Sequence, residues 1–349
     1  MKALVLNELC EIDTGEGPHG GPFPLKKEPL DLVDLPDPVP DRNQILVRVS
    51  ACGICHTELD EIEGRLAPPR FPMVLGHEIV GRVEGMGSSA TRYRKGDRVG
   101  IAWIYSSCGT CKFCRRGNEN LCDEFQATGL HAHGGYAQYT VVPEDFAYPV
   151  PEAFSDLEAA PLLCAGVIGY RALRLSGARQ GDVLGLYGFG ASAHIAIQVA
   201  KHRGCKVFVF TRPGQKGHQE LAKNLGADWV GVTGEAPPLK LACAIDFTPV
   251  GEPVKEALAV LEKGGRVVIN AIRKVNPLPQ LDYGKYVWHE KEIKSVANVA
   301  RQDAIEFLPL AAEIGIRPEV QAFELESANH ALVLLKQGRM HGAGVLRIS

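Results

Sequence analysis

The sequence predicts an α/β protein of two domains, one rich in β-strands and one built on a doubly wound parallel sheet. The chain has 349 residues, 45% of them apolar, which is more than one ordinary core accommodates. Before Pro151, short apolar runs are separated by many turns. After Pro151, apolar strands alternate with helical patterns, and that alternation is typical of a parallel sheet.

Apolar and β-branched runs mark the strands of the first part. We expect strands at 44–50, 74–83 and 98–102. The segment 15–40 is dense in glycine and proline, which predicts a surface loop or ribbon instead of regular structure.

The second part reads as strands and helices in alternation. Helices are expected at 157–175, 191–202, 219–225 and 254–263, and strands at 182–187, 206–210, 242–247, 266–269 and 292–297. The tail after Gln302 predicts helices at 303–312 and 327–337 and a last strand at 344–348. We expect this tail to rejoin the first domain.

Composition narrows the class of protein. The formal net charge is −3 and Lys and Arg form no long run, so we expect no nucleic-acid partner. No apolar stretch approaches the length of a membrane span, and polar and acidic residues soon follow Leu6, unlike a secretory signal. These features favour a cytoplasmic protein without a membrane partner. Ten cysteines would stay reduced there, which favours metal ligation and core packing over disulfides.

Four cysteines lie within one short loop and have the spacing of a closed metal site: Cys108, Cys111, Cys114 and Cys122. Four thiolates around a tetrahedral ion leave no position for substrate, so the loop predicts a structural zinc. The alternative is a redox or disulfide cluster, which this spacing disfavours.

A glycine turn stands between an expected strand and an expected helix. It reads Gly188-Phe189-Gly190-Ala191-Ser192-Ala193 and matches G-x-G-x-x-A. The first glycine permits the tight turn, the second lets the backbone approach a pyrophosphate, and the small third residue allows close packing of helix and strand. The pattern favours a dinucleotide site over a purely structural turn.

The end of the next strand bears on the choice of dinucleotide. An NAD-binding fold usually offers Asp or Glu there, whereas this chain has Thr211-Arg212. Without a carboxylate nothing repels a 2′-phosphate, and the guanidinium can pair with one. We therefore favour NADP over NAD; Arg212 as a solvated turn residue is the alternative.

A second set of metal ligands lies upstream. Cys55 and His77 offer a thiolate and an imidazole, with Glu78 beside the histidine. Cys164 is the best candidate for a third ligand, although a buried apolar thiol is an equally good interpretation of its residue type. Two cysteines and one histidine leave a fourth position open, as a catalytic zinc requires.

At this point the chain resembles the zinc-containing, medium-chain alcohol dehydrogenases, whose ligand set is the one just described. The resemblance follows family order over nearly the whole chain. The segments that carry it are Gly53-Ile54-Cys55-His56-Thr57-Glu58, Gly76-His77-Glu78, Gly96-Asp97-Arg98-Val99, the four-cysteine lobe, Gly134-Gly135-Tyr136-Ala137, Leu163-Cys164-Ala165-Gly166 and the glycine turn.

The resemblance implies the fold and the assembly. It implies a GroES-like catalytic domain from residues 1–153 and 295–349, which holds both zinc sites and a structural zinc lobe at about 103–123. A Rossmann dinucleotide-binding domain would occupy 154–294. Members of the family form homodimers or homotetramers.

The resemblance also implies residue roles. Cys55, His77 and Cys164 become ligands of a catalytic zinc, and the four lobe cysteines become ligands of a structural zinc. Thr57 would hydrogen-bond the substrate hydroxyl, unless it only caps a helix. Glu58 and Glu78 would orient the ligands from outside, unless they are merely exposed acids.

Three further positions are less typical. His56 matches a residue that touches the cofactor pyrophosphate in some members, and is otherwise a surface histidine. Asp60 stands where several family members have a histidine that ends a proton relay to solvent. The reference pKa of a carboxylate is far below that of imidazole, so the proton follows another route if Asp60 is not the relay. Trp103 would line the substrate pocket and narrow it toward primary alcohols, unless it is plain core.

The function implied is zinc-dependent hydride transfer between a primary or small secondary alcohol and NAD(P), with aldehyde reduction as the reverse reaction. Two alternatives remain. A zinc-free quinone reductase would share the fold but lack Cys55, His77 and the four-cysteine loop. A non-enzymatic zinc protein that binds a partner would keep the lobe without an open metal site.

Overall fold

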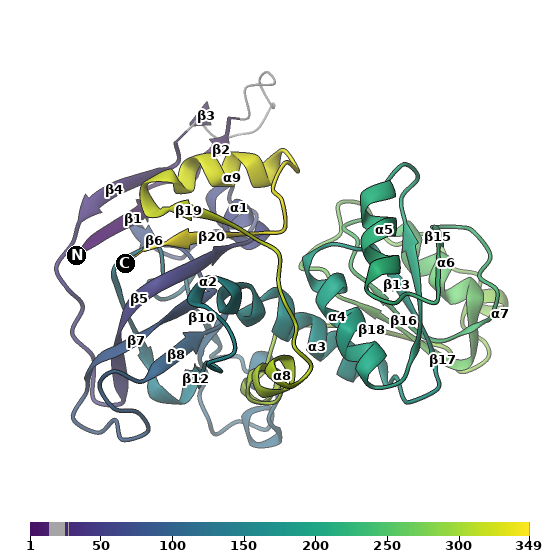
Figure 1. Cartoon of the computed structure of the whole chain (residues 1–349), viewed down its shortest axis with the longest axis horizontal. Coiled ribbons are helices and arrows are strands. Elements are labelled where there is room, and N and C mark those ends of the chain that lie inside the picture. Colours follow the sequence, from purple (N-terminus) through teal and green to yellow (C-terminus); the bar gives the residue numbers. More distant parts are fainter. Residues whose placement is uncertain (14–24, 27, 349) are drawn as a thin grey trace. The chain divides into compact units, whose positions relative to one another are not determined.

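The computed structural model describes residues 1–13, 25–26 and 28–348 and divides into two compact units. The first unit contains residues 1–164, 300–312 and 317–349, and the second contains 165–299 and 313–316. Figure 1 shows both. The expected domain boundary at 153/154 therefore differs from this division. Residues 154–164 stay with the first unit because Asp156 accepts hydrogen bonds from Ser50 Oγ and Arg98 Nε.

The first unit is built mainly of strands. Its strands are β1 (Lys2–Leu6), β2 (Glu11–Ile12), β3 (Leu25–Lys26), β4 (Leu30–Asp34), β5 (Gln44–Ile54), β6 (Met73–Val74), β7 (Ile79–Met86), β8 (Arg98–Ile101), β9 (Ile104–Ser106), β10 (Gln126–Ala127), β11 (Tyr139–Pro143), β12 (Ala147–Pro149), β19 (Val320–Glu324) and β20 (Ala343–Arg347). Its α-helices are α1 (His56–Ile62), α2 (Asp156–Ala159), α8 (Arg301–Glu313) and α9 (Ala328–Lys336). Short 3₁₀ helices are η1 (Cys114–Arg116), η2 (Glu119–Leu121), η3 (Glu144–Phe146), η4 (Ala160–Leu163) and η5 (Leu325–Ser327).

Strand β5 is the centre of this unit. Within the main sheet the order is β12-β8-β7-β5-β20-β19, and β11 pairs with β5 as well. Apolar residues of β5 alternate toward the core, and Ile45, Val47 and Val49 are fully buried. The C-terminal strand β20 pairs antiparallel with β5, with Gly344 opposite Ile54. The far end of the chain thus lies beside the strand that leads into Cys55.

The second unit is a parallel sheet with helices packed on it. Its elements are α3 (Ala165–Ser176), β13 (Val183–Tyr187), α4 (Ala191–His202), β14 (Lys206–Thr211), α5 (Lys216–Asn224), β15 (Trp229–Val232), β16 (Leu241–Asp246), α6 (Glu252–Val260), β17 (Leu261–Ile269), α7 (Tyr283–Tyr286) and β18 (Glu292–Ser295). The strand order is β15-β14-β13-β16-β17-β18, and every neighbouring pair is parallel. The predicted α/β class with a doubly wound parallel sheet is confirmed.

Several predicted elements differ from the structure. Leu30–Asp34 is a strand, β4, because it pairs antiparallel with β1; the loop expected over 15–40 is wrong there, and residues 15–24 and 27 lie outside the described part of the chain. Helix α6 ends at Val260, not at Lys263, because Leu261 already begins strand β17. Strands β1, β15 and β19 were not anticipated, since each is short and gains its hydrogen bonds from distant partners.

The helix expected over 157–175 is broken. Helix α2 gives way to the 3₁₀ turn η4, and α3 starts after Cys164, whose φ of −122° and ψ of −77° are not helical. Pro161 lies in η4 and donates no backbone hydrogen bond. This break decides where the Cys164 thiol lies. Within the described ranges, every helix is too short or too polar to cross a lipid bilayer.

Candidate functional site

The start of helix α1 positions three of the predicted site residues. Cys55 follows β5 as the N-cap of α1, and its backbone N–H donates to Glu58 Oε2 at 2.7 Å. An acidic side chain at the third helical position closes the first turn in this way. The Thr57 hydroxyl is buried and lies 3.6 Å from Cys55 Sγ. The turn therefore holds a thiol, a hydroxyl and a carboxylate close together.

His77 is fixed from two sides. Its Nδ1 lies 2.6 Å from Glu58 Oε1, at ion-pair distance though not in hydrogen-bond alignment, and both side chains are buried. The indole of Trp103 contacts the imidazole edge-on, with ring centroids 4.9 Å apart. With Nδ1 facing a carboxylate, Nε2 is the ring nitrogen available to a metal, which is the usual arrangement of a histidine ligand.

Cys164 directly follows η4 as its C-cap. A Cβ on Gly100 of β8 would lie 2.7 Å from Leu163 Cδ2, so the missing side chain lets η4 pack directly on the sheet. The Cys164 thiol consequently lies 3.9 Å from Cys55 Sγ. Residues more than a hundred positions apart in the sequence are brought together here.

One donor atom each from Cys55, His77, Glu78 and Cys164 lies within 4.8 Å of the other three. Hydrogen bonding from Cys164 lowers the pKa of the Cys55 thiol well below its usual value. The same contact, with burial, raises the pKa of Cys164 well above its usual value. The two sulfurs thus share one proton in this structure, which a metal ion would replace on binding, and two sulfurs with an imidazole suit zinc. The donor set therefore fits a zinc ion.

The Glu78 carboxylate lies among the donor atoms themselves, whereas an acid that only orients a ligand would lie behind that ligand. The Glu78 side chain is buried. A Cβ on Gly53 would collide with Glu78 Oε2, so this glycine provides the space that the carboxylate occupies. Burial, followed by the charge of Cys55, raises the pKa of Glu78 well above its usual value. Glu78 is thus within reach of the fourth coordination position.

The other two predicted residues of α1, His56 and Asp60, are not among the converging donor atoms. Asp60 is buried, and its Oδ1 accepts a hydrogen bond from Arg65 Nε. His56 is exposed at the first position of the helix. Asp60 is thus held by an arginine that the sequence did not single out. In the sequence, the only indication of this pair is a basic residue five positions after Asp60. Residues three or four positions apart are neighbours on a helix, so a spacing of five does not predict a contact.

Glu61 is a buried acid that sequence reasoning missed. It is fully buried one helical turn after Glu58, and among the described residues neither of its carboxylate oxygens has a hydrogen-bond partner. Burial, and then the charge of Glu58, raises the pKa of Glu61 well above its usual value. The one indication in the sequence was that Glu58 and Glu61 are three positions apart, so that both acids lie on the same face of the helix.

The four lobe cysteines also converge. Their sulfurs lie within 4.8 Å of one another, with Cys111 Sγ 3.5 Å from Cys114 Sγ and Cys122 Sγ 3.5 Å from Cys108 Sγ. Backbone hydrogen bonds from Thr110 and Cys111 lower the pKa of Cys108 to about 6, so a thiolate forms readily there. Four sulfur donors in one closed loop fit a structural zinc ion.

The glycine turn has the shape that a pyrophosphate requires. Gly188 has φ of +80°, and a Cβ there would lie 3.0 Å from Thr248 Cγ2. A Cβ on Gly190, by contrast, would meet no atom within 4 Å, so the turn leaves that side open. Gly190 is the N-cap of α4, whose first N–H groups belong to Ala191, Ser192 and Ala193. These residues fit a dinucleotide.

At the end of β14, Thr211 and Arg212 have different environments. Thr211 is buried, and its hydroxyl accepts a hydrogen bond from Gln219 Nε2 at 2.9 Å. Arg212 is exposed, and its backbone N–H donates to Gln215 Oε1. The guanidinium is therefore accessible to a ligand in solvent.

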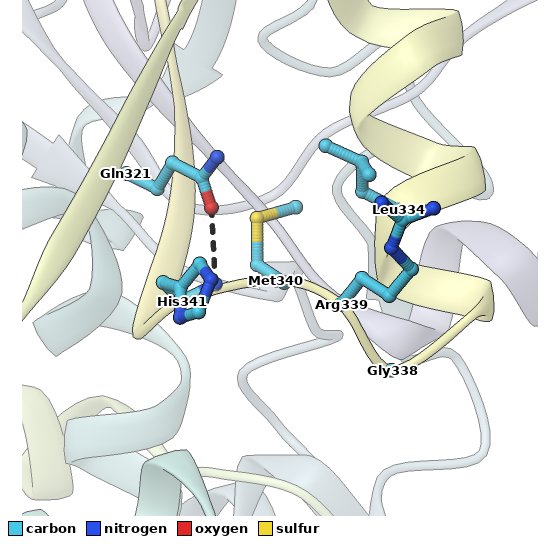
Figure 2. Close-up of a pocket in the computed structure, with 6 residues that line it drawn as sticks. All are labelled: Gln321, Leu334, Gly338, Arg339, Met340 and His341. Carbon is cyan, nitrogen blue, oxygen red and sulfur yellow. Dashed lines mark hydrogen bonds between the residues drawn. The ribbon is translucent and has the colours of Figure 1, made fainter.

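A separate hollow lies on the first unit, away from these residues. It has a volume of about 480 Å³ and lies between the end of α9 and β19. Figure 2 shows the residues that line it: Gln321, Leu334, Gly338, Arg339, Met340 and His341. The backbone N–H of His341 donates to Gln321 Oε1 across it. The predicted site residues are not among those that line this hollow.

Two family models match the chain. Residues 41–152 match the alcohol dehydrogenase GroES-like domain, and residues 193–313 match the zinc-binding dehydrogenase domain. The first match spans Cys55, His77 and the four-cysteine lobe, and the second begins inside the glycine turn.

Known relatives extend over almost the full length. A probable alcohol dehydrogenase, AdhA, from Mycobacterium tuberculosis (strain CDC 1551 / Oshkosh) is 43% identical over 332 residues, which are 94% of this chain and 95% of that protein. An alcohol dehydrogenase from Geobacillus stearothermophilus is 33% identical over 100% of this chain and 99% of its own. Among solved structures, an NAD-dependent alcohol dehydrogenase superposes with a TM-score of 0.86 at 27% identity and covers 100% of both chains.

Proposed function

The chain belongs to the zinc-containing, medium-chain alcohol dehydrogenase family, with its GroES-like and Rossmann domains, and we propose from this premise that it is a zinc- and NAD(P)-dependent enzyme. Its substrates are primary or small secondary alcohols and the corresponding aldehydes or ketones. The convergence of Cys55, His77 and Cys164 carries the proposal, because it combines a zinc ligand set with a position that substrate can occupy.

Cys55, His77 and Cys164 hold the catalytic zinc, and the four lobe cysteines hold a structural zinc. When bound, zinc supplies Lewis acidity that lowers the pKa of an alcohol, and the nicotinamide accepts the hydride. Glu58 fixes the His77 ring so that Nε2 faces the metal position. Glu78 would be able to bind the zinc when substrate is absent, since its carboxylate lies among the ligand atoms.

Thr57 and Trp103 orient the substrate. The Thr57 hydroxyl lies beside Cys55 Sγ, where it would accept a hydrogen bond from the alcohol hydroxyl and pass its own proton to water as it receives the proton of the alcohol. Trp103 packs against the His77 ring and forms an apolar cluster with Ala127 and Leu130. A bulky indole this close to a zinc ligand limits the width of the pocket, which favours primary and small secondary alcohols.

The proton leaves by a route other than Asp60. The Asp60 carboxylate is already paired with Arg65, so accepting a proton would cost that ion pair. We propose that the proton passes from Thr57 through water, and that the exposed His56, the next residue along the chain, contributes to cofactor binding as its counterpart does in some family members.

The glycine turn binds the pyrophosphate of the dinucleotide. Gly188, Gly190 and the first N–H groups of α4 provide the anion site. We propose NADP as the preferred cofactor, because Arg212 is exposed and strand β14 ends in Thr211 instead of a carboxylate. The alternative is a preference for NAD, the cofactor named for the solved NAD-dependent alcohol dehydrogenase described above.

The enzyme forms a homo-oligomer through strand β18. This strand is at the edge of the second unit's sheet, and all four of its residues are exposed. Trp288 and Ile293 are exposed to 59% and 41%. Antiparallel pairing of two copies about Ile293 would place Glu292 of one opposite Lys294 of the other, which is a favourable cross-strand pair.

A panel of alcohols and aldehydes assayed with NAD(P)⁺ and NAD(P)H, combined with metal analysis, tests the proposal. We expect two zinc ions per chain and turnover of primary alcohols. One ion per chain without turnover would favour a zinc protein that binds a partner. Quinone reduction without bound zinc would favour the zinc-free reductase.

A further inference from the structure

Lys274 makes two short hydrogen bonds at one edge of the second unit. Its ammonium donates to Asp246 Oδ2 and to the Thr248 carbonyl oxygen at 2.5 and 2.6 Å. Asp246 is fully buried, whereas 14% of the Lys274 side chain is exposed. A buried carboxylate needs such a partner, because an unpaired charge in the interior is costly.

The pair shapes the turn that follows strand β16. The backbone N–H and hydroxyl of Thr248 donate to the other Asp246 oxygen, Oδ1, at 2.9 and 2.7 Å. The next residues are tied as well, since Val275 N–H donates to the Pro249 carbonyl oxygen at 2.7 Å. Lys274 therefore fastens the connection after β17 to the turn after β16.

This turn supports the glycine turn. Asp246 pairs in register with Tyr187, the last residue before Gly188, and Phe247 N–H donates to the Tyr187 carbonyl oxygen at 2.9 Å. Thr248 Cγ2 lies 3.0 Å from the Cβ position of Gly188. A shift of Thr248 would therefore move the backbone that approaches the pyrophosphate.

We infer that Lys274 is a positioning residue for the dinucleotide, acting through Asp246 and Thr248 on the glycine turn. The inference rests on the proposed function, since it assumes that this turn binds the dinucleotide. Asp246 and Thr248, the two residues that accept hydrogen bonds from Lys274, lie at the carboxyl edge of the parallel sheet. Ligands of such sheets bind at this edge.

The same sheet offers a control pair of the same chemistry, although it is more exposed than Lys274 and Asp246. Lys201 Nζ lies 2.7 Å from Asp228 Oδ2, and Asp228 accepts the backbone N–H of Val207. That pair joins the end of α4 to the start of β15, at the amino edge of the sheet. A lysine–aspartate pair that only stabilises the domain should behave like Lys201 and Asp228.

The experiment measures dissociation constants of NADH and NADPH by nicotinamide fluorescence on zinc-loaded wild-type enzyme, Lys274→Met, Lys274→Arg and Lys201→Met. We expect Lys274→Met to weaken binding of the better dinucleotide about tenfold, the effect of one lost charged hydrogen bond. Lys274→Arg should recover part of the affinity, and Lys201→Met should bind like wild type. If Lys274→Met does not fold, Thr248→Val takes its place, because it removes the hydroxyl bond to Asp246.

Two results overturn the inference. One is unchanged affinity in Lys274→Met, or in Thr248→Val where that variant replaces it. The other is equal weakening in Lys201→Met, which would mean general destabilisation. A wild-type enzyme that binds neither dinucleotide would overturn the proposed function together with the inference, so the two failures are distinguishable.

Discussion

At the scale of single residues, the cluster around Cys55 consists of candidate donor atoms and of the side chains that hold them in place. Cys55 and Cys164 face each other at 3.9 Å, and His77 is oriented by Glu58 and Trp103. The supporting residues are as buried as the ligands, so the site is assembled before any substrate arrives.

Cys55→Ser should abolish alcohol oxidation, because a serine hydroxyl is a poor zinc ligand and remains protonated. Zinc analysis of the purified variant should give about one ion per chain, held by the four-cysteine lobe. Cys205→Ser, at a buried cysteine of the second unit, is the control and should retain both ions. Normal turnover in Cys55→Ser would contradict the assignment.

Asp60→Asn should reduce the turnover number only modestly, by less than about fivefold, because Arg65 already holds the carboxylate. Steady-state kinetics over a range of pH measures this. Arg65→Gln is the companion variant, since it removes the Arg65 partner and leaves the Asp60 carboxylate in place. A loss of activity of a hundredfold or more in Asp60→Asn would identify Asp60 as the working relay.

At the scale of elements, helix α1 is tied to α9 and β2 through Glu63. Lys336 Nζ of α9 lies 2.5 Å from Glu63 Oε1, and the backbone N–H of Ile12 donates to the same oxygen. Arg65 pairs with the other oxygen. The helix that carries the metal-binding cluster at its start is thus anchored at its end by charged side chains.

Glu63→Gln should destabilise the protein by about 2 kcal/mol at pH 7, the usual value of a charged hydrogen bond in a half-buried site. Burial opposes ionisation of Glu63, but hydrogen bonds from Lys336 and Arg65 lower its pKa below the usual value. A lowered folded-state pKa stabilises the protein above the unfolded-state pKa of about 4.3, and this stability is lost as pH falls through the folded-state pKa.

Urea unfolding of wild type and Glu63→Gln across pH 3 to 8 measures this effect. The difference between them should shrink toward zero at the acid end. Glu84→Gln, in the surface pair with Lys95, is the control and should unfold like wild type. A difference that is independent of pH would show that Glu63 stabilises α1 by packing alone.

At the scale of the whole molecule, each of the two units contributes its own candidate site residues. The metal-binding clusters lie in the first unit, and the glycine turn and Arg212 lie in the second. In the proposed function, cofactor preference would therefore depend on residues remote in sequence from the metal ligands.

Arg212→Ala should raise the KM for NADPH about tenfold and leave the KM for NADH within about twofold, because only NADPH offers a 2′-phosphate to the guanidinium. Initial rates with both cofactors measure this. Lys216→Ala, at a neighbouring exposed cation on α5, reports on general electrostatic attraction. If wild type uses NADH at far lower concentration than NADPH, the preference for NADP is wrong.

Ile293→Lys should convert the oligomer to a smaller species, because a lysine at the centre of an edge strand opposes strand pairing. Light scattering coupled to size-exclusion chromatography measures the mass. Ile305→Lys is the control, since Ile305 is exposed to a similar extent on α8 in the first unit. An unchanged mass in Ile293→Lys would exclude β18 as the contact.

Local patterns predicted much of the fold and of the candidate site. The lobe cysteines lie within fifteen positions, and the glycine turn within six, so their geometry follows from a single loop or turn. Alternation of strands and helices after Pro151 predicted the parallel sheet for the same reason. Single short strands were less predictable, since β1, β15 and β19 depend on partners supplied by the fold.

The sequence by itself therefore determined the donor chemistry and the family: which thiols, imidazole and glycines are present, and at what spacing. Only the tertiary structure decided which of them meet. It broke the helix at Cys164, placed the Glu78 carboxylate among the donor atoms, paired Asp60 with Arg65 and joined Lys274 to Asp246. The physical reason is that donor type is a property of each residue, whereas convergence depends on packing between segments distant in the chain.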